Sequence, residues 1–228
     1  MPLFLQSFRR FQWLGLLLLA VTATGCQSIL LPLMYVIGGP PMVEPEFYTQ
    51  TRHSITDKKK PVVLLCWVPD EIRVQSNESA VDYELSKYLA MTLVQGDKKI
   101  KVVDPDLVQE WMRNNPDWTD AREIGEHFGA GYLIRVDLSS YNLYEENSTE
   151  LYRGRADYVV NVMDVESGKD IYTRGKQSKW PTSTPHSADE MPLPRFKQMY
   201  LTALSSEIGR LFYETAAGDD IKDRAILQ

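Results

Sequence analysis

The stretch PVVLLCWV, from Pro61 to Val68, decides how the chain folds. It is almost wholly apolar, contains three β-branched valines, and is followed by a second proline, Pro69. Apolar and polar residues do not alternate in it, so both faces of a strand formed here would be covered. The stretch therefore predicts a strand in the centre of a sheet. Cys66 is interpreted as a small core residue of that strand, since no neighbouring group would lower its pKa.

The residues that follow the strand predict a helical crossover to a second strand. Residues 69–77 are polar and predict a loop, and residues 78–95 place apolar side chains on one stripe of a helix. Gly96 and Asp97 end that helix. Residues 100–103 predict a short strand, which the crossover makes parallel to the first one.

Two short helices are expected next. Asp104 followed by Pro105 is typical of an N-cap and a first helical residue, and this helix stops before Pro116. Thr119 or Asp120 begins the second helix. The residues that follow these two helices predict strands.

Three strands in succession and a final helix complete the predicted fold. Glu166-Ser167-Gly168-Lys169 is a strong hairpin turn between the last two strands. Residues 181–194 predict a Pro/Ser/Thr loop, and residues 195–215 predict an amphipathic helix. The strands, the first of which alternates with period two, are residues 132–144, 150–165 and 170–180. The element order β-α-β-α-α-β-β-β-α predicts an α/β fold with a mixed sheet and helices packed on it.

The N-terminal stretch RRFQWLGLLLLAVTATGC, Arg9 to Cys26, has the layout of an export signal. Two arginines are followed by an apolar run that is too short to span a bilayer, and then by small residues. The last four residues, ATGC, resemble the lipobox of bacterial lipoproteins. This resemblance implies that Cys26 is lipidated and anchors the chain to a lipid bilayer. The alternative is an uncleaved anchor helix with an incidental cysteine.

A second apolar run, Ile29 to Ile37, follows Cys26 and is interrupted by Pro32. It would lie beside the lipid headgroups or pack on the folded body. Lys58-Lys59-Lys60 forms a basic cluster, which is interpreted as solvating the start of the first strand, with contact to anionic lipid as the alternative. The predicted organisation is a signal peptide (1–25), a lipidated tether and linker (26–60), an α/β periplasmic domain (61–217) and a loose charged tail (218–228).

Composition and motifs argue against several classes of function. The net charge of −6 makes a nucleic-acid partner unexpected. None of the three histidines, His53, His127 and His186, has a Cys, Asp or Glu at metal-like spacing. The sequence has no G-x-S-x-G, S-x-x-K or H-E-x-x-H motif and no phosphate-binding loop. No cofactor and no catalytic residues are therefore predicted, and the chain is not expected to be an enzyme.

Four aromatic residues of the predicted strands could form a protein-binding face at one end of the sheet, because Tyr and Trp are common interface anchors. The favoured alternative is that they pack in the core. Asp137 and Asp164, also on strands, are expected to pair with Arg135, Arg153 or Arg155. The four aromatic residues are Tyr141, Tyr144, Tyr152 and Trp180.

The ordered set of local sequences resembles the periplasmic domain shared by the curli-secretion lipoprotein CsgG, the LpoB-type activators of penicillin-binding proteins and the N-terminal domain of TolB. The resemblance covers most of residues 61–215, although no single motif is diagnostic. The resemblance implies that the protein binds other envelope proteins or assists their assembly, and that it could form an oligomer. It also implies that the domain carries no catalytic residues. The matching pieces are Trp67-Val68-Pro69, residues 78–95, IKVVD (100–104), IGEHFGAGYLI (124–134) and VMDVESGK (162–169).

Three functions compete on this basis. The first is a membrane-anchored binding, assembly or adaptor lipoprotein facing the periplasm. The second is a subunit of a CsgG-like secretion pore, disfavoured because residues 69–79 and 181–194 lack the long alternating strands that face lipid. The third is an envelope hydrolase without a recognisable motif. Because Gln27 rather than Asp follows Cys26, the resemblance favours the outer over the inner membrane.

Overall fold

The computed structural model describes residues 41–76 and 78–217. The chain divides into two units, Met1–Met42 and Val43–Gln228, and nearly all described residues belong to the second. The predicted signal peptide, Cys26, the apolar run Ile29–Ile37 and the tail 218–228 lie outside the described residues, so those interpretations stay predictions. No helix in the described ranges is both long and apolar enough to cross a membrane.

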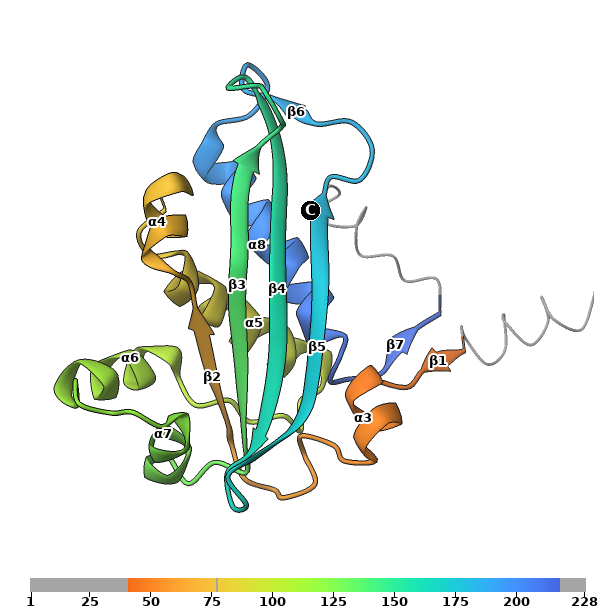
Figure 1. Cartoon of the computed structure of the whole chain (residues 1–228). Helices are drawn as coiled ribbons and strands as arrows, with labels where there is room; N and C mark the ends of the chain where they lie inside the picture. Colours follow the sequence, from red (N-terminus) through yellow and green to blue (C-terminus); the bar gives the residue numbers. More distant parts are fainter. Residues whose placement is uncertain (1–40, 77, 218–228) are drawn as a thin grey trace, which may run out of the picture. The chain divides into compact units, whose positions relative to one another are not determined.

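The folded unit is built on a mixed five-stranded sheet (Figure 1). Residues 132–144, 151–164 and 169–180 form an antiparallel meander, as predicted, and residues 62–67 pair in parallel with the first strand of this meander. Gly168 adopts a φ of +67° in the hairpin turn, a conformation that suits glycine. The strands in spatial order are β2 (Val62–Trp67), β3 (Tyr132–Tyr144), β4 (Leu151–Asp164) and β5 (Lys169–Trp180), and β6 (His186–Ser187) pairs with the start of β4.

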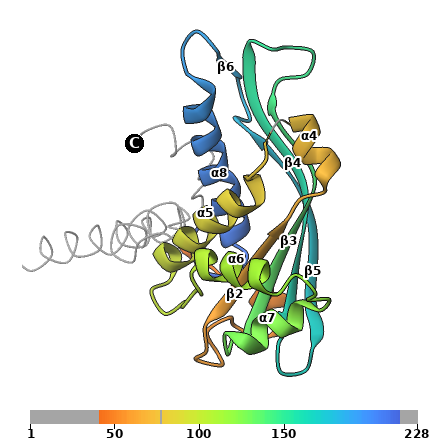
Figure 2. The same cartoon turned by 90° about the vertical axis from the view of Figure 1, so that its left-hand side faces the viewer.

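Helices cover the two faces of this sheet unequally (Figure 2). The helices α5 (Val81–Gly96) and α8 (Leu193–Gly209) pack on one face and enclose the larger core cluster. The helices α6 (Pro105–Asn114) and α7 (Ala121–His127) cover the opposite face only at β2 and β3, where they enclose a smaller cluster. The stripe predicted for the last helix is buried, and consists of Phe196, Tyr200, Ala203, Leu204, Ile208 and Leu211.

The predicted helix starts are confirmed by their caps. The side chain of Asp104 accepts a hydrogen bond from the backbone N–H of Asp106 at 2.9 Å, and Pro105 is the first residue of α6. Asp120 and Glu123 form a capping box at the start of α7. These caps satisfy backbone donors that a helix N-terminus leaves without partners.

Three predictions near β2 were wrong. The strand lies at the edge of the sheet rather than in its centre, and residues 100–103 form only an isolated parallel bridge, Val62 with Val102, on its outer side. The chain cannot extend this pairing, because Asp104 caps α6 two residues later. Residues 70–76, expected in a loop, form the helix α4 (Asp70–Ser76), whose two N-terminal acidic residues favour a helix start.

The folded unit begins near residue 43 rather than at residue 61. Helix α3 (Glu46–Thr51) lies within the predicted linker and buries Phe47 almost completely. The Phe47 ring packs edge-on against Tyr172 at 5.5 Å between ring centroids. The backbone N–H of Phe47 donates to the carbonyl of Leu211 at 3.0 Å. Two short strands, β1 (Met42–Val43) and β7 (Thr215–Ala216), pair with each other.

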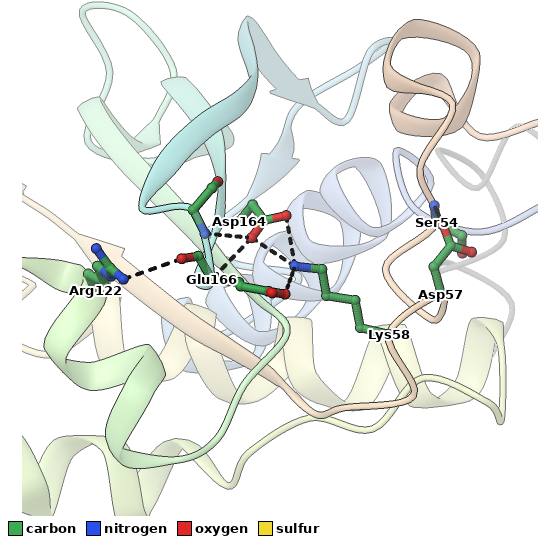
Figure 3. A network of polar contacts seen from close by, with 7 residues as sticks. Ser54, Asp57, Lys58, Arg122, Asp164 and Glu166 are labelled. Atoms are coloured by element: carbon green, nitrogen blue, oxygen red, sulfur yellow. Dashed lines mark hydrogen bonds and ion pairs between the residues drawn. The ribbon is translucent and has the colours of Figure 1, made fainter.

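An ion-pair network fastens the segment between α3 and β2 to the β4–β5 hairpin (Figure 3). Lys58 Nζ donates to both carboxylate oxygens of Asp164 at 2.7 Å and lies 3.5 Å from Glu166. Asp164 also accepts hydrogen bonds from the backbone N–H groups of Glu166 and Ser167. Lys58 further lies over the ring of Tyr132. Asp164 therefore pairs with this lysine rather than with an arginine, whereas Asp137 pairs with Arg135 as expected.

We expect Phe47→Ala to lower the free energy of unfolding by about 3–5 kcal/mol, because it empties a packed aromatic site. Chemical denaturation of the purified protein measures this. Tyr48→Ala is the matched control, since Tyr48 is exposed on the same helix and should change stability by no more than about 0.5 kcal/mol. Equal effects of the two variants would show that α3 is not docked.

We expect Lys58→Met to cost about 1–2 kcal/mol near neutral pH, between the values for exposed and buried ion pairs. Burial acts to raise the pKa of Asp164, but the hydrogen bonds from Lys58 and from Ser167 N–H outweigh it, so the pKa is lowered. A carboxylate with a lowered pKa stabilises the fold above its unfolded pKa of about 3.9, and this contribution is lost as pH falls through the folded pKa. The cost of Lys58→Met should therefore shrink below about pH 4.

Denaturation at several pH values measures the cost, with Lys59→Met as the exposed control. A cost that is unchanged at acidic pH would contradict the role of the Asp164 carboxylate.

Candidate functional site: a cleft at the end of strand β2

The candidate site lies where the helical cover of one sheet face ends. Val63, Leu65 and Trp67 form one row of β2 that faces α6 and α7, and the first two are buried in the smaller core cluster. Trp67, the last residue of the strand, is 53% exposed. An exposed tryptophan at the end of an otherwise buried row is unusual, since large apolar side chains are normally covered.

Trp67 belongs to a cleft of about 990 Å³ between the end of β2, the helices α4 and α6 and the first turn of α5. Trp118 from the α6–α7 connection and Met112 from α6 contribute further apolar surface, and Tyr83 contributes an aromatic ring from α5. The volume is typical of a site that receives a small molecule or a protruding group of a partner.

Charges in the cleft are balanced and mostly paired. Three arginines (Arg73, Arg113, Arg135) and three aspartates (Asp82, Asp106, Asp137) contribute to its lining. Arg73 bonds Asp82 at 2.5 Å, and Arg135 bonds Asp137 at 2.9 Å. Because opposite charges are held next to each other, the cleft presents hydrogen-bonding groups without a net charge. A highly charged ligand has no electrostatic advantage there.

The rim of the cleft is stiffened by contacts between α5 and α6. The Tyr83 hydroxyl and the Lys87 ammonium both donate to the carboxylate of Asp106. The hydrogen bond from Tyr83, followed by that from Lys87, lowers the pKa of Asp106, which therefore stays ionised. This triad positions the first turn of α6 against α5.

The cleft contains a buried cysteine and paired charges. Burial raises the pKa of the Cys66 thiol to about 12, so this lining residue is held as an unreactive thiol. In the described ranges no group of three His, Cys, Asp or Glu side chains could hold a metal ion. The paired arginines and aspartates suit hydrogen bonding to a partner.

The aromatic face that the sequence left as the less favoured interpretation is not exposed. Tyr141, Tyr152 and Trp180 are buried, and Tyr144 is partly buried beside Tyr152. The rings of Tyr152 and Trp180 pack on Phe196 of α8. The alternative interpretation, core packing, is therefore the correct one, because α8 lies along the face of the sheet on which these rings point.

Sequence reasoning missed the cleft because it expected both faces of β2 to be covered throughout. The available signal was the position of Trp67 directly before Val68 and Pro69, at the end of the strand, where cover commonly ends. Cys26, the other predicted site residue, lies outside the described residues.

Comparisons with known proteins give structural likenesses only. No protein-family model matches the chain, and no curated protein sequence matches it. Similar solved structures include the PelC dodecamer from Paraburkholderia phytofirmans, with 11% identity, 76% of this chain and 96% of that chain covered, and a TM-score of 0.42. Lipoprotein GNA1162 from Neisseria meningitidis has 12% identity, coverage of 65% and 97%, and a TM-score of 0.39.

The C-terminal domain of LpoB from Salmonella enterica has 13% identity, coverage of 58% and 98%, and a TM-score of 0.36. LpoB-type activators are one of the groups that the sequence resembles. Because all three TM-scores are below 0.5, the partners and roles of these proteins are not transferred to this chain.

Proposed function

We propose that the protein is a non-catalytic lipoprotein of the bacterial cell envelope that faces the periplasm and binds another envelope protein in the cleft at Trp67. The observation that carries the proposal is the exposed ring of Trp67 within a cleft of balanced charge. Tryptophan and arginine are the side chains most often responsible for binding energy in protein interfaces. Trp67 and Arg135 come from neighbouring strands at this place.

The properties of the cleft match a protein partner. An apolar side chain of the partner would pack against Trp67, Trp118 and Met112 and remove their surface from water. The paired arginines and aspartates around them would accept and donate hydrogen bonds at the rim. Such an arrangement gives specificity without requiring a charged ligand.

The sequence supports the lipid anchor. The export signal ends at a lipobox-like ATGC, and acylation of Cys26 would hold the folded unit at a bilayer. An outer-membrane location remains part of the proposal on the basis of Gln27. An adaptor of this kind brings its partner to the membrane instead of transforming a substrate.

Metabolic palmitate labelling tests the anchor. We expect Cys26→Ala to lose the label and to release the folded unit from the membrane fraction. Cys66→Ala is the matched control, because the chain has two cysteines and Cys66 is buried in β2. Retention of the label in Cys26→Ala, or an unlabelled wild type that stays in the membrane, would refute the lipid anchor at Cys26. Neither result would contradict the proposal that the cleft binds a partner.

Photocrosslinking in intact cells tests the cleft. A crosslinking phenylalanine analogue in place of Trp67 should give one discrete adduct of defined mass, and the same analogue in place of exposed Leu151 should not. A second change, Thr119→Tyr, fills the cleft from its exposed rim and should reduce the adduct at least about tenfold, because the added ring occupies the space that the partner needs. An adduct that is insensitive to Thr119→Tyr would show that the partner binds elsewhere.

A further inference from the structure

Five exposed lysines gather at the end of the folded unit opposite to the cleft end of β2. They come from two segments that are far apart in the sequence. The N–H of Val62 donates to the carbonyl of Lys101 at 2.8 Å, and the N–H of Val103 donates to Val62 at 2.9 Å, so the segments lie side by side. We call this set the lysine patch, and it comprises Lys59, Lys60, Lys98, Lys99 and Lys101.

The patch is positive in a chain whose net charge is −6. Lys58 does not contribute, because Asp164 and Glu166 hold it. Two aspartates lie within the same segments, and each accepts a hydrogen bond from a nearby backbone N–H. Asp57 accepts from the N–H of Ser54, and Asp97 accepts from the N–H of Lys99. Five lysines against these two aspartates leave three positive charges, and the network of Lys58 with Asp164 and Glu166 lowers this surplus to two.

Exposed apolar side chains border the patch. Met91 and Val94, on the last turns of α5, are 51% and 43% exposed. Val94 lies four residues and Met91 seven residues before Lys98, which follows the end of this helix at Gly96. A surface that joins lysines to exposed apolar side chains is typical of contact with anionic lipid, where the charges meet headgroups and the apolar groups enter the interface.

The tether reaches the folded unit at this same end. Phe47 of α3 contacts Leu211 and Phe212 at the end of α8. The ring of the next residue, Tyr213, lies against Gly96, the last residue of α5, which immediately precedes Asp97 and Lys98. The start of the folded unit and the lysine patch are therefore neighbours, and Figure 1 shows α3 and the segment leading into β2 at this end of the sheet.

The length of the tether keeps the patch close to the bilayer. Seventeen residue steps separate Cys26 from Val43. A chain of this length spans about 60 Å at most and about 20–25 Å as a flexible coil. A lipid at Cys26 thus holds the lysines at a high effective concentration near the headgroups.

We propose that the lysine patch docks the folded unit on the anionic surface of the membrane that holds its lipid anchor. This inference rests on the proposed anchor. It adds that the folded unit has a defined orientation on the membrane. The docking is electrostatic, so it weakens as salt screens the lysines.

Lysine-acylation rates in the full-length processed lipoprotein test the proposal. The protein is reconstituted into vesicles of phosphatidylcholine alone or of phosphatidylcholine with phosphatidylglycerol, and peptide mass spectrometry follows each lysine. We expect the patch lysines to react at least about threefold more slowly on the anionic vesicles at low salt and to recover in about 1 M salt. Lys179, exposed near the other end of the sheet, should react equally on both vesicles.

A matched pair of variants sharpens the test. The double change Lys98→Glu with Lys99→Glu should abolish the protection of Lys59, Lys60 and Lys101, whereas Lys179→Glu should preserve it. Equal rates on both vesicles for the wild type would overturn the proposal. Slow labelling that salt does not relieve would also overturn it, and would assign the lysines to a protein contact.

Co-flotation with the vesicles separates this proposal from the anchor. A protein that floats with phosphatidylcholine vesicles but shows no protection on anionic ones is anchored without docking, so only the docking is refuted. A protein that floats only with anionic vesicles supports the docking and refutes the anchor.

Discussion

The parallel pairing of β2 with β3 is the constraint on which the rest of the fold depends. β2 is apolar on both faces, so pairing it in register with β3, Val62 beside Tyr132 and Trp67 beside Asp137, creates two surfaces that both need cover. The helices α5 and α8 supply one layer, and α6 and α7 supply the other. The second layer ends before Trp67, and the cleft is the space left by its incomplete cover.

The N-terminal part of the described chain joins the fold through separate interactions. Phe47 fills an aromatic site between β5 and the end of α8, and Lys58 binds the β4–β5 hairpin through Asp164. The Phe47 contact is apolar and the Lys58 contact is ionic. They should therefore respond differently to pH and to truncation of the side chain. Together they make residues of the predicted linker part of the folded unit.

Much of the fold was predictable because its signals are local. The meander, the Gly168 turn, the caps at Asp104 and Asp120 and the stripe of α8 each depend on short patterns of residues. The edge position of β2, the docking of Phe47 and the exposure of Trp67 depend on which distant segments meet. For the same reason the sequence favoured core packing of the four aromatic residues but left an exposed face open: alternation shows that Tyr152 and Trp180 share a side, but only α8 shows that the side is covered.

The two proposed surfaces lie at opposite ends of one strand, and this arrangement would give them an order relative to the membrane. The lysine patch adjoins Val62 at the start of β2, and the cleft begins at Trp67 at its end. Five residue steps of about 3.3 Å place these ends about 17 Å apart along the strand. Docking through the lysines would therefore raise the cleft away from the headgroups, so a partner could reach Trp67 without entering the lipid surface. Because β2 is buried on both faces between these ends, it would act as a stiff spacer between anchor and partner.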